Sequence, residues 1–157
     1  VQSYFMKSVL IEANKRLTKM TDSRYELKKK ETETRLNVKT GLDFSIFDSY
    51  TGKEREVASL SGGEKFKASL ALALGLSDTI STNRGGIKID SLFIDEGFGS
   101  LDSESLNQAL NILSDLSGND KLVGVISHVS ELMSRIDNKI LVNKTNTGSI
   151  VRIESNC

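Results

Sequence analysis

The amino-acid sequence predicts an α/β protein: a parallel sheet flanked by helices, preceded by an amphipathic helix and a small antiparallel sheet. Three observations support this fold class. Apolar residues recur every third or fourth position over 1–20, and they alternate with polar residues over 42–46. After residue 87, two continuous apolar runs alternate with helical segments, and such runs are typical of parallel strands covered on both faces.

Length and composition describe one globular domain. The chain has 157 residues, of which 38% are hydrophobic and 12 are Gly, so its core needs neither disulfides nor a structural metal. Its one Cys cannot form an internal bridge, and we expect a reducing, cytoplasmic compartment. The longest apolar stretch, 68–76, is far shorter than the roughly 20 residues that cross a bilayer, which predicts no membrane partner.

Charge is balanced overall but not along the chain. There are 21 Lys+Arg and 21 Asp+Glu in total, whereas residues 1–40 hold ten Lys/Arg against five Asp/Glu. This basic region suits an anionic partner such as DNA, although a solvated helix and strand face explains it equally well. The chain begins with Val1 rather than Met, so we expect a segment of a longer protein.

The first helix has a narrow apolar stripe, which suits the end of a coiled-coil helix over 1–22. The remainder, 23–157, is expected to contain a small antiparallel sheet over 24–58, a buried helix over 61–80 and an alternating part over 87–157.

Within the small sheet, a turn at 51–53 leads into a strand near 55–58. Within the alternating part we expect strands at 87–95 and 121–126, helices at 103–116 and 130–135, and a terminal hairpin of 139–143 with 149–153. The hairpin is expected to close the edge of the parallel sheet.

A capping pattern with two glycines opens the buried helix. In Leu60-Ser61-Gly62-Gly63-Glu64, Ser61 and Glu64 have the spacing of a capping box. Capping does not explain two glycines in the first turn, where each costs about 1 kcal/mol relative to Ala. Glycines there leave N–H groups open at the positive end of a helix, where phosphate oxygens bind. A flexible cap and an anion site fit these five residues equally.

Two adjacent acids, Asp95 and Glu96, end the first continuous apolar strand. In an open parallel sheet, ligands bind outside the carboxyl ends of the strands. Consecutive strand side chains point to opposite faces, so Asp95 is a candidate Mg²⁺ ligand and Glu96 a candidate general base. The alternative is an acidic turn that only solvates the strand end.

Asp102 and His128 follow at comparable places. Asp102 comes after Ser100-Leu101 and is placed to cap the helix that begins near Ser103. His128, the one histidine, follows the second apolar strand and is expected at the same sheet edge as the two acids. A neutral imidazole there can donate to a phosphate oxygen and accept from water. The alternatives are a plain helix cap and a satisfied surface histidine.

In this order, the motifs resemble the carboxy-terminal lobe of an ABC-type ATPase head. Residues 60–64 resemble the ABC signature, 92–96 resemble Walker B with its catalytic glutamate, 100–102 resemble the D-loop, and His128 resembles the switch histidine. The resemblance implies an ATPase with ATP and Mg²⁺ as cofactors.

Three runs, 94–102, 68–78 and 126–129, resemble the SbcC family. These proteins are ATPase subunits of a bacterial nuclease that processes DNA double-strand breaks, and in them two half-heads flank a long coiled coil. The predicted coiled-coil helix fits that arrangement. Transporter subunits usually have a Pro after the catalytic Glu, whereas this chain has Gly97 there and no Pro at all.

The chain lacks a G-x-x-x-x-G-K-[ST] phosphate loop. The family supplies that loop from the amino-terminal half-head of the same polypeptide, so the isolated chain is expected to be inactive.

The resemblance implies a sandwich of two copies of the head. In its own head, Asp95 would bind Mg²⁺, Glu96 would activate water and His128 would contact the γ-phosphate. Ser61, Gly62 and Gly63 would close over the ATP of the second head, and Glu64 and Asp102 are the further nucleotide-binding residues. The sandwich would gate access of double-stranded DNA to an SbcD-like metal-dependent nuclease, and the basic 1–40 region is a candidate contact for either.

Two other functions fit the same motifs. One is the head of a DNA-organising clamp of the SMC or RecN kind, in which ATP binding matters more than turnover. The other is a transporter's nucleotide-binding subunit, against which the missing Pro and the extended stretch 77–90 argue.

Overall fold

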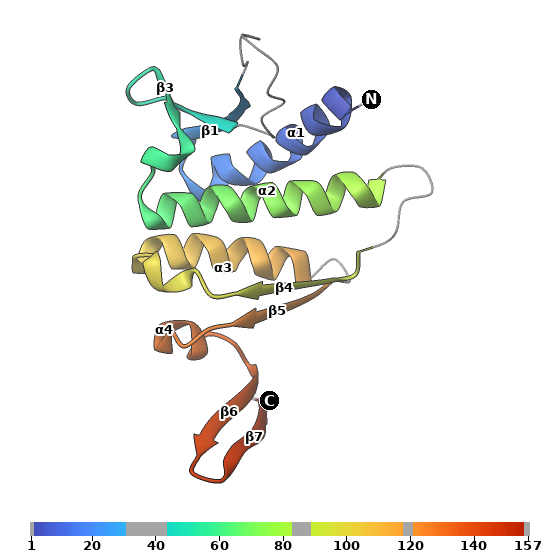
Figure 1. The fold of residues 1–157 in the computed structure, drawn as a ribbon, viewed down its shortest axis with the longest axis vertical. Coiled ribbons are helices and arrows are strands. Elements are labelled where there is room, and N and C mark those ends of the chain that lie inside the picture. Colours follow the sequence, from blue (N-terminus) through green and yellow to red (C-terminus); the bar gives the residue numbers. More distant parts are fainter. Residues whose placement is uncertain (1, 31–43, 83–88, 118–120, 156–157) are drawn as a thin grey trace.

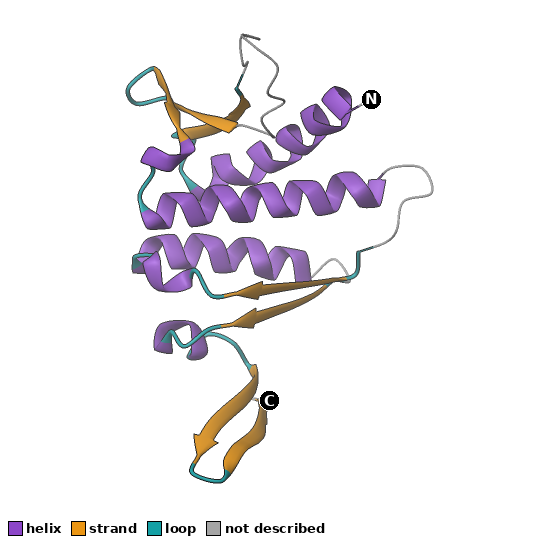
Figure 2. Ribbon diagram, in the orientation of Figure 1, coloured by secondary structure: helices purple, strands orange, loops and turns teal. Residues whose placement is uncertain are grey.

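The computed structural model describes residues 2–30, 44–82, 89–117 and 121–155. Long helices form its centre and stack in the order α1, α2, α3 (Figure 1). Strands lie on both sides of this stack (Figure 2). The helices are α1, Gln2–Met20; α2, Gly62–Thr82; α3, Ser103–Ser117; and α4, Ser130–Met133.

The strands of the described residues form three sheets. An antiparallel sheet in the order β1-β2-β3 confirms the predicted small sheet, β4 and β5 pair in parallel, and β6 and β7 form a hairpin. Their bounds are β1, Tyr25–Lys29; β2, Phe44–Asp48; β3, Lys53–Glu56; β4, Ser91–Asp95; β5, Leu122–Ile126; β6, Asn138–Thr145; and β7, Gly148–Ser155.

The main core lies where α2 is enclosed by α1, α3 and the small sheet. The predicted apolar stripe of α1 is confirmed, because Val9, Ala13, Leu17 and Met20 are buried. The buried apolar residues of α3 belong to the same core cluster. Buried residues that form this core include Ala13, Leu17, Met20, Ile46, Ala71, Leu74, Phe98, Leu106 and Ala109.

Helices α1 and α2 approach closely at Gly75. A Cβ atom at this position would lie 2.6 Å from the Val9 carbonyl oxygen and 2.6 Å from the Ala13 nitrogen. Both are backbone atoms, which cannot move aside as a flexible side chain can. The glycine therefore sets how near the two helices lie, and Val9 and Ala13 are almost fully buried as a result.

Polar side chains also connect α1 to the strand β1 and to α2. The Asn14 amide donates to the Leu27 carbonyl oxygen (2.9 Å), and its oxygen accepts from the Leu27 N–H (2.8 Å). This side chain pairs with the edge strand β1 as another strand would. Asp78 of α2 is paired with Arg16 of α1 and with Lys121 at the start of β5 (3.1 Å).

Three predictions about strands are wrong. The hairpin β6–β7 does not close the parallel sheet, because among the described strands β6 and β7 pair only with each other and extend away from the helices (Figure 1). The apolar runs are not covered on both faces: Leu92 and Ile94 pack against the core, whereas Phe93 between them is 66% exposed, since no described element covers its face. The third strand ends at Glu56 rather than residue 58, because a 3₁₀ turn, Val57–Ser59, follows it.

Parts of two predicted segments lie outside the described residues. They are 31–43 of the predicted small antiparallel sheet and 87–88 of the predicted strand 87–95. None of the helices that the structure describes is both long and apolar enough to cross a membrane.

We expect Gly75→Ala to destabilise the chain by about 1–3 kcal/mol, because the added methyl group overpacks the α1–α2 contact. At an ordinary helix position the same exchange stabilises by up to about 1 kcal/mol, so the sign is diagnostic. Ala73→Gly, at an exposed position of α2, measures the propensity effect alone. Thermal unfolding followed by circular dichroism tests this, and a raised melting temperature for Gly75→Ala would contradict it.

Candidate functional site

The parallel pairing of β4 with β5 brings Glu96 and His128 together. Asp95 lies opposite Ile126, and the Glu96 N–H donates to the Ile126 carbonyl oxygen (2.9 Å). This extends the pairing one residue past β4, so the residues that follow β4 and β5 lie side by side. His128 Nδ1 lies 3.2 Å from Glu96 Oε1, and both side chains are exposed. Asp95, also exposed, ends β4 at the same edge.

Glu96 adopts an uncommon backbone conformation. Its φ is +59°, in the left-handed region that non-glycine residues avoid, and Gly97 follows with a φ of +98°. The turn ends β4 abruptly and directs the chain toward the 3₁₀ turn Phe98–Ser100. Strained residues of this kind cluster at functional sites, because the surrounding structure must hold them.

The ring of Phe66, in the first turns of α2, covers Gly97. A Cβ atom there would collide with the ring, and the ring also contacts that of Phe98 edge to face, with centroids 4.7 Å apart. Phe98 is 1% exposed. The turn after Glu96 is therefore packed directly against the helix that carries the predicted signature.

We expect Gly97→Ala to destabilise the chain by about 1–3 kcal/mol, because it combines an unfavourable φ with a collision against Phe66. Gly99→Ala is the matched control: a Cβ atom there would meet only Val129 Cγ2, at an ordinary 3.8 Å. Denaturant unfolding of the two variants measures the difference. Equal stability of the two variants would show that the turn does not need glycine.

The predicted capping box at the start of α2 is confirmed. The Ser61 N–H donates to Glu64 Oε2 (2.8 Å), and the Glu64 N–H donates to Ser61 Oγ (3.3 Å). The N–H groups of Gly62 and Gly63 donate to no acceptor among the described residues, as is usual for the first turn of a helix. These groups have the open arrangement that an anion site requires.

The two signature glycines also lie against the predicted D-loop. A Cβ atom at Gly62 would lie 3.3 Å from the Ser100 Cβ, and one at Gly63 would lie 3.0 Å from the Ser100 carbonyl oxygen. Close approach of another backbone segment is thus a second reason for glycine here, which the sequence did not reveal. The contact joins the two motifs into one surface.

Asp102 caps α3, as predicted. Its Oδ1 accepts from the Ser105 N–H (2.8 Å) and its Oδ2 accepts from the Ser105 hydroxyl (3.1 Å). These hydrogen bonds, with a smaller contribution from the charge of Lys67, lower the pKa of Asp102. The cap explains Asp102 without a ligand, and its nucleotide role stays a prediction.

A charged cluster behind the signature was not predicted. It consists of Arg24, Tyr25, Asp48, Arg55 and Glu64, and we call it the Asp48 cluster. Arg24 contacts Asp48 (Nη2 to Oδ2, 3.3 Å) and Glu64 (Nη1 to Oε1, 3.8 Å), while Arg55 contacts Asp48 (3.5 Å). The Tyr25 hydroxyl donates to Glu64 Oε1 (2.7 Å). No short sequence pattern identifies the cluster, because its members come from β1, β2, β3 and α2 or lie beside them.

Asp48 is a buried carboxylate, with its side chain 0% exposed. Burial alone would raise its pKa, but hydrogen bonds from Arg24 and from the Tyr50 N–H, together with the charges of Arg24 and Arg55, lower it instead. The ionised form is therefore the stable one, and removing either arginine would leave a buried charge poorly compensated.

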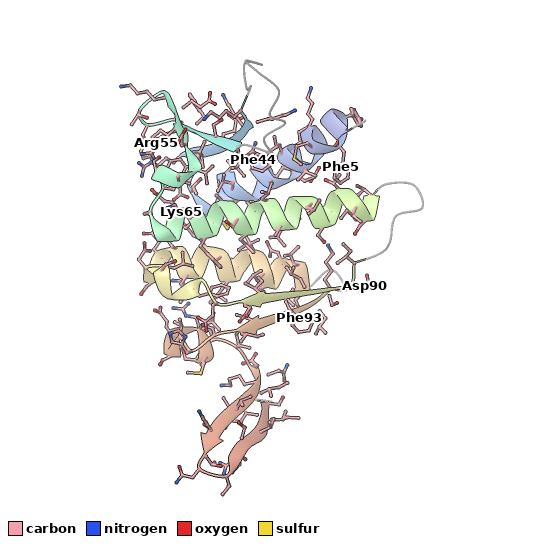
Figure 3. All side chains as sticks on the ribbon, viewed as in Figure 1. Phe5, Phe44, Arg55, Lys65, Asp90 and Phe93 are labelled. Atoms are coloured by element: carbon pink, nitrogen blue, oxygen red, sulfur yellow. The ribbon has the colours of Figure 1, made fainter. Side chains whose placement is uncertain are left out.

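The signature, the D-loop and the end of α1 surround a cavity of about 460 Å³. Its lining includes Arg24, Ser61, Lys67, Asp102 and Gln108. Lys67 and Gln108 are hydrogen-bonded across it (3.1 Å). Figure 3 shows Lys65, which directly follows Glu64, at the end of the molecule toward which β4 and β5 run.

The predicted site residues therefore fall into two neighbouring groups. Ser61, Gly62, Gly63, Glu64 and Asp102 surround the start of α2, and Asp95, Glu96 and His128 lie at the sheet edge. Gly97 and Phe66 connect the groups.

The residues present suit Mg²⁺ only in part. Among the described residues, no group of three or more His, Cys, Asp or Glu side chains could hold a metal ion. Asp95 contributes one exposed carboxylate. Mg²⁺ typically uses one or two carboxylates with substrate phosphates and water, so this single ligand fits a shared site and not a self-contained one.

Comparison with known proteins gives a consistent family. A family model described as SbcC/RAD50-like, Walker B motif, matches residues 33–115. The SbcC subunit of the SbcCD nuclease from Vibrio cholerae is 50% identical over 153 residues, which are 98% of this chain and 15% of that protein. The SbcC subunit from Treponema pallidum is 50% identical over 147 residues, 94% of this chain and 14% of that protein. The chain thus spans about one-seventh of the length of these relatives.

Solved structures with the same fold include heads of SMC proteins. One, from work on ATP-driven dimerization and DNA-stimulated activation of SMC ATPases, has a TM-score of 0.73 at 16% identity and covers 98% of this chain and 86% of its own. The Smc head of Pyrococcus furiosus bound to the C-terminal domain of ScpA has a TM-score of 0.71 at 16% identity, covering 96% of this chain and 35% of its own. At these identities the likeness concerns the fold, and it confirms the predicted ATPase-head lobe.

Proposed function

The chain belongs to the SbcC/RAD50-like Walker B family, and from this membership we propose that it is the carboxy-terminal half of an SbcC-type ATPase head. The observation that carries the proposal is the contact of Glu96 with His128 (3.2 Å) at the carboxyl edge of the parallel sheet. Both side chains are open to a substrate there.

We assign each residue at that edge a separate task. Glu96 orients the attacking water and accepts its proton, while His128, beside it, donates a hydrogen bond to the γ-phosphate. Asp95 would hold Mg²⁺ jointly with ATP and the amino-terminal half, and the bound ion would offset the charge on the phosphate oxygens. Without nucleotide, neutral His128 can donate from Nδ1 to Glu96 Oε1 and so orient the carboxylate. Donation to the γ-phosphate would use Nε2–H, and a neutral imidazole carries one N–H, so the two contacts use different tautomers.

The signature acts on a different nucleotide. The open N–H groups of Gly62 and Gly63, with the Ser61 hydroxyl, would bind the γ-phosphate of ATP in a second copy of the head. Because those bonds exist only in the closed sandwich, ATP would favour closure and hydrolysis would release it. The capping-box contacts hold Ser61 ready for this without using its hydroxyl proton.

Exposed apolar strands support docking of the amino-terminal half. Phe93, Leu122 and Ile126 are 66%, 64% and 56% exposed on β4 and β5. On the hairpin, the cross-strand partners Ile140 and Ile153 are 69% and 80% exposed. Exposed apolar surface of this extent marks an interaction site. The amino-terminal half, which would also supply the phosphate loop, is the occupant that the family suggests.

The partners follow from the same membership. The relatives are named as subunits of a nuclease, so we propose that the complete head gates access of double-stranded DNA to an SbcD-like metal-dependent nuclease in the bacterial cytoplasm. Of the basic 1–40 region, α1 and β1 are described, and they remain the candidate contact for nuclease or DNA.

We expect Glu96→Gln in the complete polypeptide to lower the rate of ATP hydrolysis at least about 100-fold, because the amide cannot accept the proton from water. ATP-dependent association of the heads should persist, since binding does not need the base. Both are measured with purified protein, Mg²⁺ and ATP. Glu131→Gln, an exchange at a partly exposed glutamate of α4, is the control.

Two outcomes would contradict this proposal. Unchanged hydrolysis in Glu96→Gln would remove the assigned base. Head association with negligible turnover in the unmodified protein would favour a DNA-organising clamp of the SMC kind.

A further inference from the structure

One carboxylate joins Tyr25 to the backbone of the signature serine. Glu64 Oε1 accepts from the Tyr25 hydroxyl (2.7 Å), and its Oε2 accepts from the Ser61 N–H (2.8 Å). Tyr25 and Glu64 are 39 positions apart in the sequence. The side chain of Tyr25 therefore acts on the start of α2 from outside that helix.

Tyr25 is in turn fixed to α1 and to the small sheet. Its N–H donates to Thr21 Oγ1 (3.3 Å), and the Thr21 hydroxyl donates to the Leu17 carbonyl oxygen in α1 (2.7 Å). Arg55 Nη2 donates to the Tyr25 hydroxyl oxygen (3.2 Å). Because Tyr25 is 3% exposed, its hydroxyl cannot leave this position without opening the core.

The hydrogen bond from Tyr25 does more than give the Glu64 carboxylate a partner. The Glu64 side chain is 27% exposed, so water could hydrate Oε1 if Tyr25 were absent. A capping box needs only the helix residues themselves. What Tyr25 adds is a fixed direction for the carboxylate and, through it, for Ser61.

The protonation states keep the link intact. Burial, together with the hydrogen bond to Glu64, raises the pKa of Tyr25 to about 12, so the hydroxyl remains a donor at neutral pH. Burial would raise the pKa of Glu64, but hydrogen bonds from Tyr25 and Ser61 and the charge of Arg24 lower it. The pair is thus a neutral hydroxyl donating to a carboxylate, which is a strong form of hydrogen bond.

We propose that Tyr25 is a positioning residue for the signature: through Glu64 it fixes Ser61, and through Thr21 it connects Ser61 to the end of α1. This inference rests on the proposed function, because Ser61 affects ATP only if the signature closes over a nucleotide. A displacement of α1 would reach the ATP-binding serine through three hydrogen-bonded residues, Thr21, Tyr25 and Glu64.

The test is a double-mutant cycle in the complete polypeptide assembled with its nuclease partner. Tyr25→Phe removes only the hydroxyl, and Tyr50→Phe is the matched control at a neighbouring exposed tyrosine. We expect Tyr25→Phe to raise the KM for ATP about five-fold, which corresponds to about 1 kcal/mol, with kcat within about two-fold of the unmodified protein. In a Glu64→Ala background, Tyr25→Phe should have no further effect.

A second measurement covers the case in which Glu64→Ala does not fold. Hydrogen exchange of the Ser61 amide should be about five-fold faster in Tyr25→Phe than in the unmodified protein or in Tyr50→Phe.

The outcomes separate this inference from the proposed function. If the unmodified protein does not hydrolyse ATP, both are overturned. If it does, the inference alone is overturned when Tyr25→Phe leaves KM and the Ser61 amide unchanged. The same holds when its effect persists undiminished in Glu64→Ala or when Tyr50→Phe reproduces it.

Discussion

The position of α2 is the constraint on which the rest of the molecule depends. At its start, Phe66 covers the turn that follows Glu96, and in its middle Gly75 admits the backbone of α1. Near its end, Asp78 forms ion pairs with Arg16 of α1 and with Lys121, which directly precedes β5. Because α2 is rigid and is contacted at its start, middle and end, its first turn cannot move independently of the parallel sheet or of α1. The predicted signature and the edge that carries Glu96 and His128 therefore keep one fixed relation.

Electrostatics fix the same first turn from behind. The Asp48 cluster places two arginines against two carboxylates, one of which is fully buried. Such a cluster is weak support for stability as such, since desolvation opposes the charge attraction. Its function here is orientation: Glu64 points at the Ser61 N–H because Tyr25 and Arg24 hold its other oxygen.

Local patterns in the sequence predicted the helices, the capping box, the cap at Asp102 and the joint edge of Glu96 with His128. Each of these depends on residues a few positions apart or on the rule that parallel strands end at one edge. The contact of Phe66 with Gly97 and the Asp48 cluster were missed, because they depend on packing between distant segments that no periodicity encodes.

The failed prediction that β4 and β5 are covered on both faces has a different cause. A continuous apolar run such as 92–94 is typical of a strand covered on both faces, whereas the described residues cover one face of β4, so Phe93 is exposed. The apolar hairpin was misplaced for the same reason. Exposed apolar faces of this kind are typical of interaction sites.

We propose that each ATP lies between the catalytic edge of one head and the signature of another. Mixing complete polypeptides that carry Ser61→Arg with others that carry Glu96→Gln tests it most directly, because each is inactive alone. Mixed pairs form in about half of the assemblies, and each has one intact site of two, so we expect recovery of about a quarter of the unmodified hydrolysis rate. No recovery, in mixtures shown to contain mixed pairs, would contradict it.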